Sequence, residues 1–113
     1  MSIRKILIIP IFALLISLTN CTKSTPLTKQ QHKYAGQWQC DDGSYFVIEY
    51  SGKGDVKRSG MTITGGNTTI DSSTIVIGMM GIEQTYTITK EPITDSIHGI
   101  TTMELDGVKY IKI

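Results

Sequence analysis

The sequence predicts an all-β domain: a small antiparallel meander, closed into a barrel or packed as a tight sandwich, of about seven or eight short strands. From Tyr34 onward Thr, Ile, Val and Tyr are abundant, and such β-branched and aromatic residues favour strands. Gly and Asp interrupt the apolar runs at short intervals, as turns require. No long apolar stripe with the helical period of 3.6 residues appears.

Each candidate strand is a short run of β-forming residues between turn residues. The runs cover residues 34–40, 44–50, 60–64, 68–71, 74–79, 83–90, 97–105 and 108–113. Gly65-Gly66-Asn67 is interpreted as the connection between two of them, and Lys53–Arg58 as a basic loop. A core of this size is sufficient without a disulfide, and Trp38 is expected to anchor it.

The first hairpin is predicted at Asp41-Asp42-Gly43, a three-residue loop with Gly43 in the left-handed conformation. This register pairs Trp38 with Phe46 and gathers aromatic residues on one face. A two-residue loop at Asp42-Gly43 would instead place Trp38 opposite Val47. We favour the first register because it collects more apolar area.

A second hairpin is predicted at Asp106-Gly107, a strong signal for a two-residue turn. It pairs Leu105 with Val108 and Met103 with Tyr110. On the other face Glu104 meets Lys109, a favourable cross-strand pair. The last strand is therefore expected to tie the C-terminus into the sheet.

The first twenty residues have the marks of an export signal, which is a helix that is later cleaved. Arg4 and Lys5 form a basic head, and an apolar run from Ile6 to Leu18 follows. Thirteen residues at about 1.5 Å each span about 20 Å, less than the roughly 30 Å of a bilayer core. A cleaved signal is thus favoured over a permanent membrane helix.

The run Leu18-Thr19-Asn20-Cys21 resembles the lipobox of bacterial lipoproteins, although Asn20 stands where that family usually has Gly, Ala or Ser. The resemblance implies cleavage before Cys21 and lipid attachment to its thiol. Thr22 follows, where an Asp would mark retention at the inner membrane. The resemblance therefore implies a lipid-anchored protein of the bacterial cell envelope, in the outer membrane, facing the periplasm or the surface.

Residues 22–33 are predicted to be a flexible, basic tether, because Leu27 is their only large apolar residue. The expected organisation is thus a signal peptide (1–20), a lipidated tether (21–33) and a β-barrel-like domain (34–113). The domain holds six basic and ten acidic residues, a formal charge of −4. This balance argues against nucleic acid as a partner, since nucleic-acid binding needs a basic surface.

The chain is poor in catalytic and metal-binding residues, and no enzyme activity, cofactor or metal site is expected. His98 is the only histidine of the domain, and no G-x-S-x-G nucleophile motif or Cys/His metal spacing is present. Lipidation of Cys21 would leave Cys40 as an unpaired thiol. Burial is favoured for it over an intermolecular bridge or a reactive role.

Two segments are candidate interaction surfaces. One is the basic loop, with Lys53, Lys57 and Arg58, and the other is the turn of Met79 and Met80 between glycines. Exposed Met residues can serve adaptable binding. The competing interpretation, which we favour, is that the Met residues close one end of a barrel.

Two resemblances suggest functions for the domain. The run from Trp38 to Glu49 resembles the first hairpin of the membrane-bound inhibitors of C-type lysozyme, which are small β-barrel lipoproteins. Ser59-Gly60 matches the start of their Ser-Gly-x-x-Tyr loop, but Ile63 stands at the Tyr position. Gly36-Gln37-Trp38 is similar to the G-x-W of lipocalins, which carry small apolar ligands in a barrel cup.

The expected function is therefore a membrane-anchored, non-catalytic binding protein of the cell envelope, with an unknown protein partner. Inhibition of C-type lysozyme is the first alternative. Carriage of a small apolar ligand is the second, and a barrel filled by Trp38, Phe46 and Tyr86 would argue against it.

Overall fold

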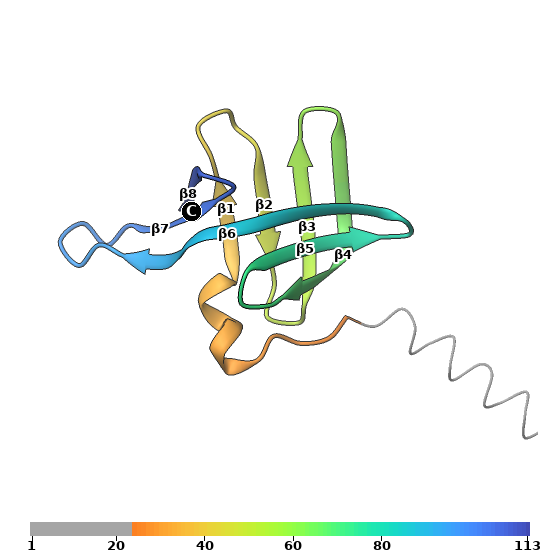
Figure 1. Cartoon of the computed structure of the whole chain (residues 1–113), viewed down its shortest axis with the longest axis horizontal. Coiled ribbons are helices and arrows are strands. Elements are labelled where there is room, and N and C mark those ends of the chain that lie inside the picture. The colour runs from red at the N-terminus through yellow and green to blue at the C-terminus, as the bar shows by residue number, and fades with distance from the viewer. Residues whose placement is uncertain (1–23) are drawn as a thin grey trace, which may run out of the picture.

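The computed structural model describes residues 24–113, so the expected signal peptide and Cys21 lie outside the described residues. Eight antiparallel strands follow one another as a meander that closes into a barrel (Figure 1). The all-β prediction is confirmed, in its barrel form. The strands are β1 (Gly36–Gln39), β2 (Tyr45–Ile48), β3 (Lys53–Arg58), β4 (Met61–Ile70), β5 (Thr74–Met79), β6 (Ile82–Thr94), β7 (Thr101–Leu105) and β8 (Val108–Lys112).

The barrel closes where the first strand pairs with the last. Trp38 lies opposite Lys112, and Gln39 lies opposite Ile111. The Lys112 ammonium lies 5.7 Å from the centre of the Trp38 ring, a cation–π contact across this seam. The C-terminus is tied into the sheet, as the sequence predicts, since Ile113 donates its N–H to the Gln37 carbonyl at 2.8 Å.

Both predicted hairpins have the expected register. Trp38 pairs with Phe46, and the Cys40 N–H bonds to the Ser44 carbonyl at 3.0 Å, with Gly43 at φ +88°. The three-residue loop is therefore the correct alternative. In the second hairpin the pairs are Leu105 with Val108, Met103 with Tyr110, and Glu104 with Lys109.

The segment Lys53–Arg58 is a strand and not a loop, so this prediction is wrong. Its sequence reads as a loop because Gly54 and Asp55 disfavour strands locally. Pairing with both neighbours overrides that preference, since β3 lies between β2 and β4. Its buried residues are Gly54 and Val56, and they alternate with the outward-facing lysines.

Gly65 and Gly66 do not form a turn, which corrects a second prediction. They lie inside β4, a strand of ten residues, opposite a register shift in β3 between Gly54 and Val56. Gly65 has φ +70°, and a Cβ on Gly66 would lie 2.9 Å from the Gly78 carbonyl oxygen. The glycines let the strand bend and approach its neighbour closely, as at a β-bulge.

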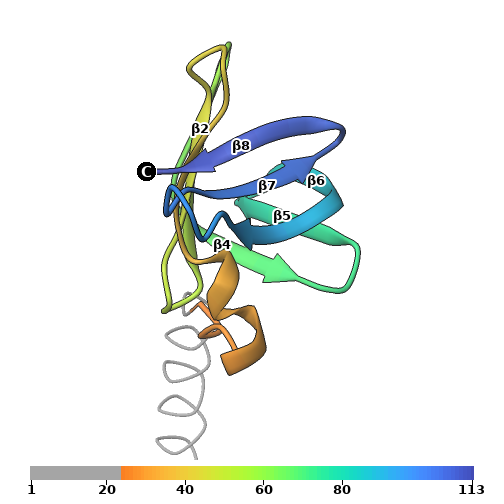
Figure 2. The ribbon, with the colours of Figure 1, turned by 90° about the vertical axis from the view of Figure 1, so that its left-hand side faces the viewer.

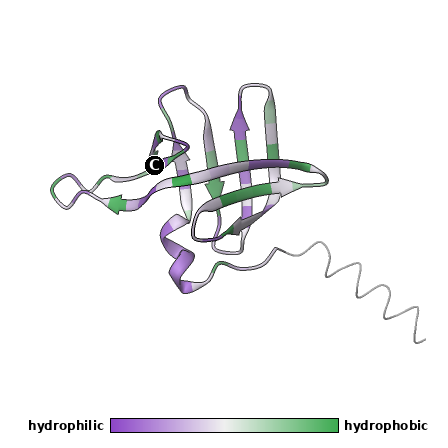
Figure 3. Cartoon of the chain, viewed as in Figure 1, coloured by the Kyte–Doolittle hydropathy of each residue, from purple (hydrophilic) through white to green (hydrophobic). Residues whose placement is uncertain are grey.

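The bend divides the barrel into two roughly crossed halves. In Figures 1 and 2 the hairpins of β1–β2 and β3–β4 stand upright, while β5 to β8 run across them. Figure 3 shows that β5 is hydrophobic along most of its length, in keeping with its buried Ile75 and Ile77.

Aromatic side chains fill the interior. Trp38 and Phe46 are fully buried and stack at 6.5 Å between ring centres, and Phe46 also contacts Tyr86 at 5.0 Å and Tyr110 at 5.3 Å. The Trp38 indole N–H donates to the Tyr34 carbonyl at 3.0 Å. Trp38 is thus the packing anchor that the sequence predicts.

The segment before β1 is packed against the barrel, which corrects the prediction of a flexible tether through residue 33. Leu27 is buried, and its N–H donates to the Tyr50 carbonyl at 2.9 Å. A 3₁₀ helix, η1 (Lys29–Tyr34), follows and replaces the expected strand start at Tyr34. Gln31 fixes it to β4 by donating to the Ile70 carbonyl at 2.8 Å.

Candidate functional site

The two hairpin ends farthest from the N-terminal segment form the best candidate site. The β1–β2 and β3–β4 turns lie side by side at the top of Figure 1, and Figure 2 agrees from the side. A groove of about 450 Å³ lies between them. We call it the hairpin groove; it is lined by Asp42, Gly43, Ser44, Tyr45, Lys57, Arg58 and Ser59.

The structure brings two of the predicted basic residues to this groove and separates the third. Lys57 and Arg58 line it, whereas Lys53 lies at the other end of β3. All three are exposed. Arg58 continues the inward row of Gly54 and Val56 beyond the buried part of the strand. Its positive charge acts on the buried phenols of Tyr86 and Tyr110.

Asp42 supplies negative charge beside these cations. Its Oδ1 accepts hydrogen bonds from the Ser44 N–H at 2.8 Å and from the Cys40 thiol at 2.9 Å. These hydrogen bonds, first from Cys40 and then from Ser44, lower the pKa of Asp42 to about 2, and Arg58 adds a smaller attraction. The groove thus presents a fixed carboxylate next to Lys57 and Arg58.

The rings of Tyr86 and Tyr110 are buried in the barrel interior, within range of the charge of Arg58. Burial raises the pKa of both, that of Tyr110 to about 12, while the charge of Arg58 opposes the rise. Both phenols are therefore neutral at physiological pH. Neither phenol lines the groove, and neither adds a negative charge beside Arg58.

Cys40 follows the last residue of β1 and is half-buried. Its burial and its hydrogen bond to Asp42 raise the pKa of the thiol. Since the thiolate is the reactive form, this environment suppresses nucleophilic reactivity at neutral pH. The geometry favours the structural role for Cys40 over the reactive one.

Met79 and Met80 do not close the barrel, which corrects the interpretation that the sequence favoured. Met79 is the last residue of β5, and Met80 forms the turn to β6 with φ +48° and 94% of its surface exposed. Gly81 follows at φ +85°, so both central residues are left-handed, as a tight two-residue hairpin requires. In Figure 1 this turn lies at the right, away from the β1–β2 and β3–β4 turns at the top.

The filled interior bears on the lipocalin-like alternative. Trp38 and Phe46 have no exposed surface and Tyr86 has 1%, and these rings occupy the volume where a ligand cup would lie. The pockets found among residues 24–113 are depressions that are open to the surface. The filled interior argues against the carriage of a small apolar ligand inside the barrel.

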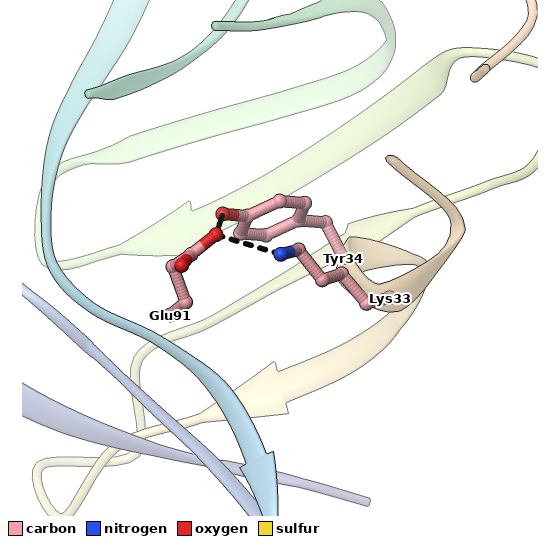
Figure 4. A network of polar contacts seen from close by, with 3 residues as sticks. All are labelled: Lys33, Tyr34 and Glu91. Carbon is pink, nitrogen blue, oxygen red and sulfur yellow. Dashed lines mark hydrogen bonds and ion pairs between the residues drawn. The ribbon is translucent and has the colours of Figure 1, made fainter. Parts of the chain in front are cut away.

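The structure contains one polar cluster that the sequence does not predict. The Lys33 ammonium lies 2.6 Å from a carboxylate oxygen of Glu91, and the Tyr34 hydroxyl donates to that oxygen at 3.4 Å (Figure 4). The contact joins η1 to β6 across 58 residues of sequence. Only tertiary structure brings these residues together, so no local signal could have found them. The exposed ion pair positions η1 and has no evident chemistry.

The described part of the chain offers little else for catalysis or metal binding. His98 pairs with Asp95 at 2.8 Å in the exposed β6–β7 loop. No three His, Cys, Asp or Glu residues between Ser24 and Ile113 lie close enough to hold a metal ion. Within the same range no helix has the length and apolar character needed to cross a membrane.

Comparison with known proteins gives no match: no family model, no curated protein and no solved structure is similar to this chain. The function of this chain is therefore inferred from its residues and from the geometry of its structure.

Proposed function

We propose that this chain is a bacterial lipoprotein, anchored in the cell envelope through lipid on Cys21, and that its barrel is a non-catalytic binding protein. The lipobox Leu18-Thr19-Asn20-Cys21 supports the anchor, and Thr22 supports the outer membrane as its location. Several acyl chains on one residue would hold the protein stably, since one chain alone binds only marginally.

The anchor is tested by metabolic labelling with a radioactive fatty acid. Wild-type protein is expected to take up label, and the Cys21→Ala variant is expected to take up none. A Cys40→Ala variant is the matched control, because it removes the other thiol and should keep the label. Label retained in Cys21→Ala would refute the lipid attachment.

We propose the hairpin groove as the binding surface for a protein partner. The single observation that carries this proposal is the placement of Lys57 and Arg58 beside the fixed carboxylate of Asp42, at the end opposite the N-terminal segment. Arg is enriched among residues that dominate binding energy, and mixed charges confer specificity. A polar partner surface that offers a carboxylate to Arg58 fits this arrangement.

Affinity capture from envelope extracts tests the groove. A partner bound by wild type should be lost with the double variant Lys57→Ala/Arg58→Ala, because truncation of a dominant Arg costs about 2 kcal/mol or more, a factor above tenfold. The control is Lys53→Ala/Lys109→Ala, which removes two exposed lysines elsewhere. A partner that binds all three proteins equally would exclude the groove.

A second candidate function is inhibition of C-type lysozyme. Ser59-Gly60 lies at the exposed β3–β4 turn, directly after Arg58, so this part of the family's motif is accessible to an enzyme cleft. Ile63 is buried at the position of the family's Tyr and offers no such contact. Titration of a C-type lysozyme with the protein decides this candidate, and unchanged activity at stoichiometric excess eliminates it.

A further inference from the structure

The N-terminal segment contacts the barrel from Ser24 onward, three residues after Cys21, where the lipid anchor would be attached. Ser24 donates its hydroxyl to Asn67 Oδ1 at 2.7 Å, and Leu27 is buried with its N–H on the Tyr50 carbonyl. A Cβ on Gly52 would overlap the Thr25 carbonyl oxygen, so the segment lies directly on the β2–β3 loop. We call residues 24–28 the strap.

The strap shortens the reach of the anchor severely. A free tether from Cys21 to Tyr34 could extend about 45 Å, whereas the three steps from Cys21 to Ser24 span at most about 11 Å. That distance is close to the Debye length at physiological salt, which is about 8 Å. Charges near Ser24 therefore remain within range of headgroup charges. A lipid on Cys21 would therefore hold the barrel against the bilayer.

The end of the barrel around the strap has the chemistry of a membrane-facing surface. Tyr50 is 61% exposed in the β2–β3 loop, with the His32 ring packed edge-on at 4.9 Å. Lys53 pairs with Asn67, the residue that Ser24 contacts, and Lys29 begins η1. Tyrosine and lysine are the residues that favour the headgroup region of a bilayer.

Three acidic residues lie at this end together with the three lysines, and one of them is in an ion pair. Glu91 is paired with Lys33, and the Asp71 carboxylate accepts hydrogen bonds from Ser73 and Thr74. Glu49 is exposed beside Tyr50 and opposes the lysines. Within the described residues neither Lys29 nor Lys53 has an ion-pair partner.

We infer that the barrel lies directly on the surface of the membrane that holds its anchor, with the strap end against anionic phospholipid headgroups. The hairpin groove then faces away from the bilayer, because it lies at the opposite end of β3, about 20 Å away at 3.3 Å per residue. This inference rests on the proposed lipid attachment at Cys21. It assigns an orientation and a lipid partner that the anchor alone does not specify.

The test compares two exposed serines at the two ends of the barrel. In a Cys40→Ser background, Ser51→Cys and Ser59→Cys each supply one free thiol, since the Cys21 sulfur would be blocked by lipid. The full chain is expressed in a bacterium, and the purified protein is labelled with a fluorophore. It is then reconstituted into vesicles of phosphatidylethanolamine and phosphatidylglycerol that carry a headgroup nitroxide.

The label at residue 51 is expected to be quenched several-fold more than the label at residue 59. Equal quenching in protein that floats with the vesicles would overturn the orientation while leaving the anchor intact. Failure to float would instead refute the lipid attachment, and with it this inference.

Lipid composition separates the headgroup contact from simple tethering. In vesicles of phosphatidylcholine alone, the difference between the two labels should shrink, since each lysine near an anionic surface contributes about 1 kcal/mol. The variant Lys29→Gln/Lys53→Gln should shrink it in the anionic vesicles, whereas Lys57→Gln/Lys109→Gln should not. An unchanged difference in all cases would reject anionic lipid as the partner.

Discussion

At the scale of the residue, backbone conformation and close contact explain which positions tolerate no change. Gly43 and Gly52 have nearly the same φ, +88° and +90°, yet their surroundings differ. A Cβ on Gly43 would meet nothing within 4 Å, while a Cβ on Gly52 would overlap Thr25. The pair separates the cost of a left-handed conformation from the cost of a steric clash.

We predict that Gly52→Ala destabilises the protein by about 1–3 kcal/mol more than Gly43→Ala does. Both variants carry the penalty for a left-handed alanine, but only Gly52→Ala displaces the strap. Urea unfolding followed by circular dichroism gives the two free energies of unfolding. Equal losses would mean that the strap does not pack on the β2–β3 loop.

Thr68 presents the opposite case, a side chain whose polarity costs stability. Its Oγ1 is buried and has no hydrogen-bond partner within the described residues. An unsatisfied buried hydroxyl costs about 1–3 kcal/mol. We predict that Thr68→Val, which keeps the shape of the side chain, stabilises the protein by about 1 kcal/mol. Thermal unfolding measures this change, and a lower melting temperature in the variant would contradict it.

At the scale of the element, pairing within the barrel decides more than local preference does. The hairpins at Asp41–Gly43 and Asp106-Gly107 were predictable because their turn residues fix the register. β3 was not, since Gly54 and Asp55 disfavour a strand until neighbours on both sides supply hydrogen bonds. The same holds for the hairpin groove. The sequence marked Lys57 and Arg58 as candidates, but only the folded meander brings Asp42 beside them.

The strap was also missed, because a segment with one large apolar residue reads as a linker. Leu27 alone fixes it by burial, with backbone and side-chain hydrogen bonds completing the contact. We predict that Leu27→Ala costs about 2–3 kcal/mol of unfolding free energy, as for other buried leucines. Ile97→Ala, in the β6–β7 loop where the side chain is 84% exposed, is the control and should change stability by less than about 0.5 kcal/mol. Urea unfolding of both proteins checks the pair.

The C-terminal part of β6 is protected against pairing with another strand. Beyond Thr87 it extends past the end of β5, which leaves an edge that another strand could join. Lys90, Glu91 and Pro92 occupy this stretch, and charges and proline are the residues that discourage edge pairing. These residues therefore disfavour the addition of another strand at this edge. The hairpin groove is thus a better candidate for a binding surface than the edge of β6.

At the scale of the whole molecule, burial of two tyrosines makes the stability of the fold depend on pH in the alkaline range. Burial raises the pKa of Tyr110 to about 12 and raises that of Tyr86 further, from an ordinary value of 10. The folded state therefore holds protons that the unfolded state releases. This contribution is fully present below pH 10 and is lost as the pH rises through 10 to 12.

We predict that these two tyrosines leave the melting temperature unchanged between pH 7 and 9. Above pH 10 the melting temperature should fall steeply. Tyr86→Phe/Tyr110→Phe removes both ionisations and should flatten the alkaline fall. Differential scanning calorimetry over this pH range measures both curves. An equally steep fall in the double variant would show that other groups cause it.

The pairing of β1 with β8 also affects how the chain folds. The barrel closes by pairing its first strand with the last residues of the chain, more than seventy positions later. Contacts this distant in sequence form slowly, because a long loop must close first. A nascent chain that lacks β8 therefore cannot close the barrel, which would suit the export that the proposed lipoprotein function requires. The closed barrel would then form only after β8 has crossed the membrane.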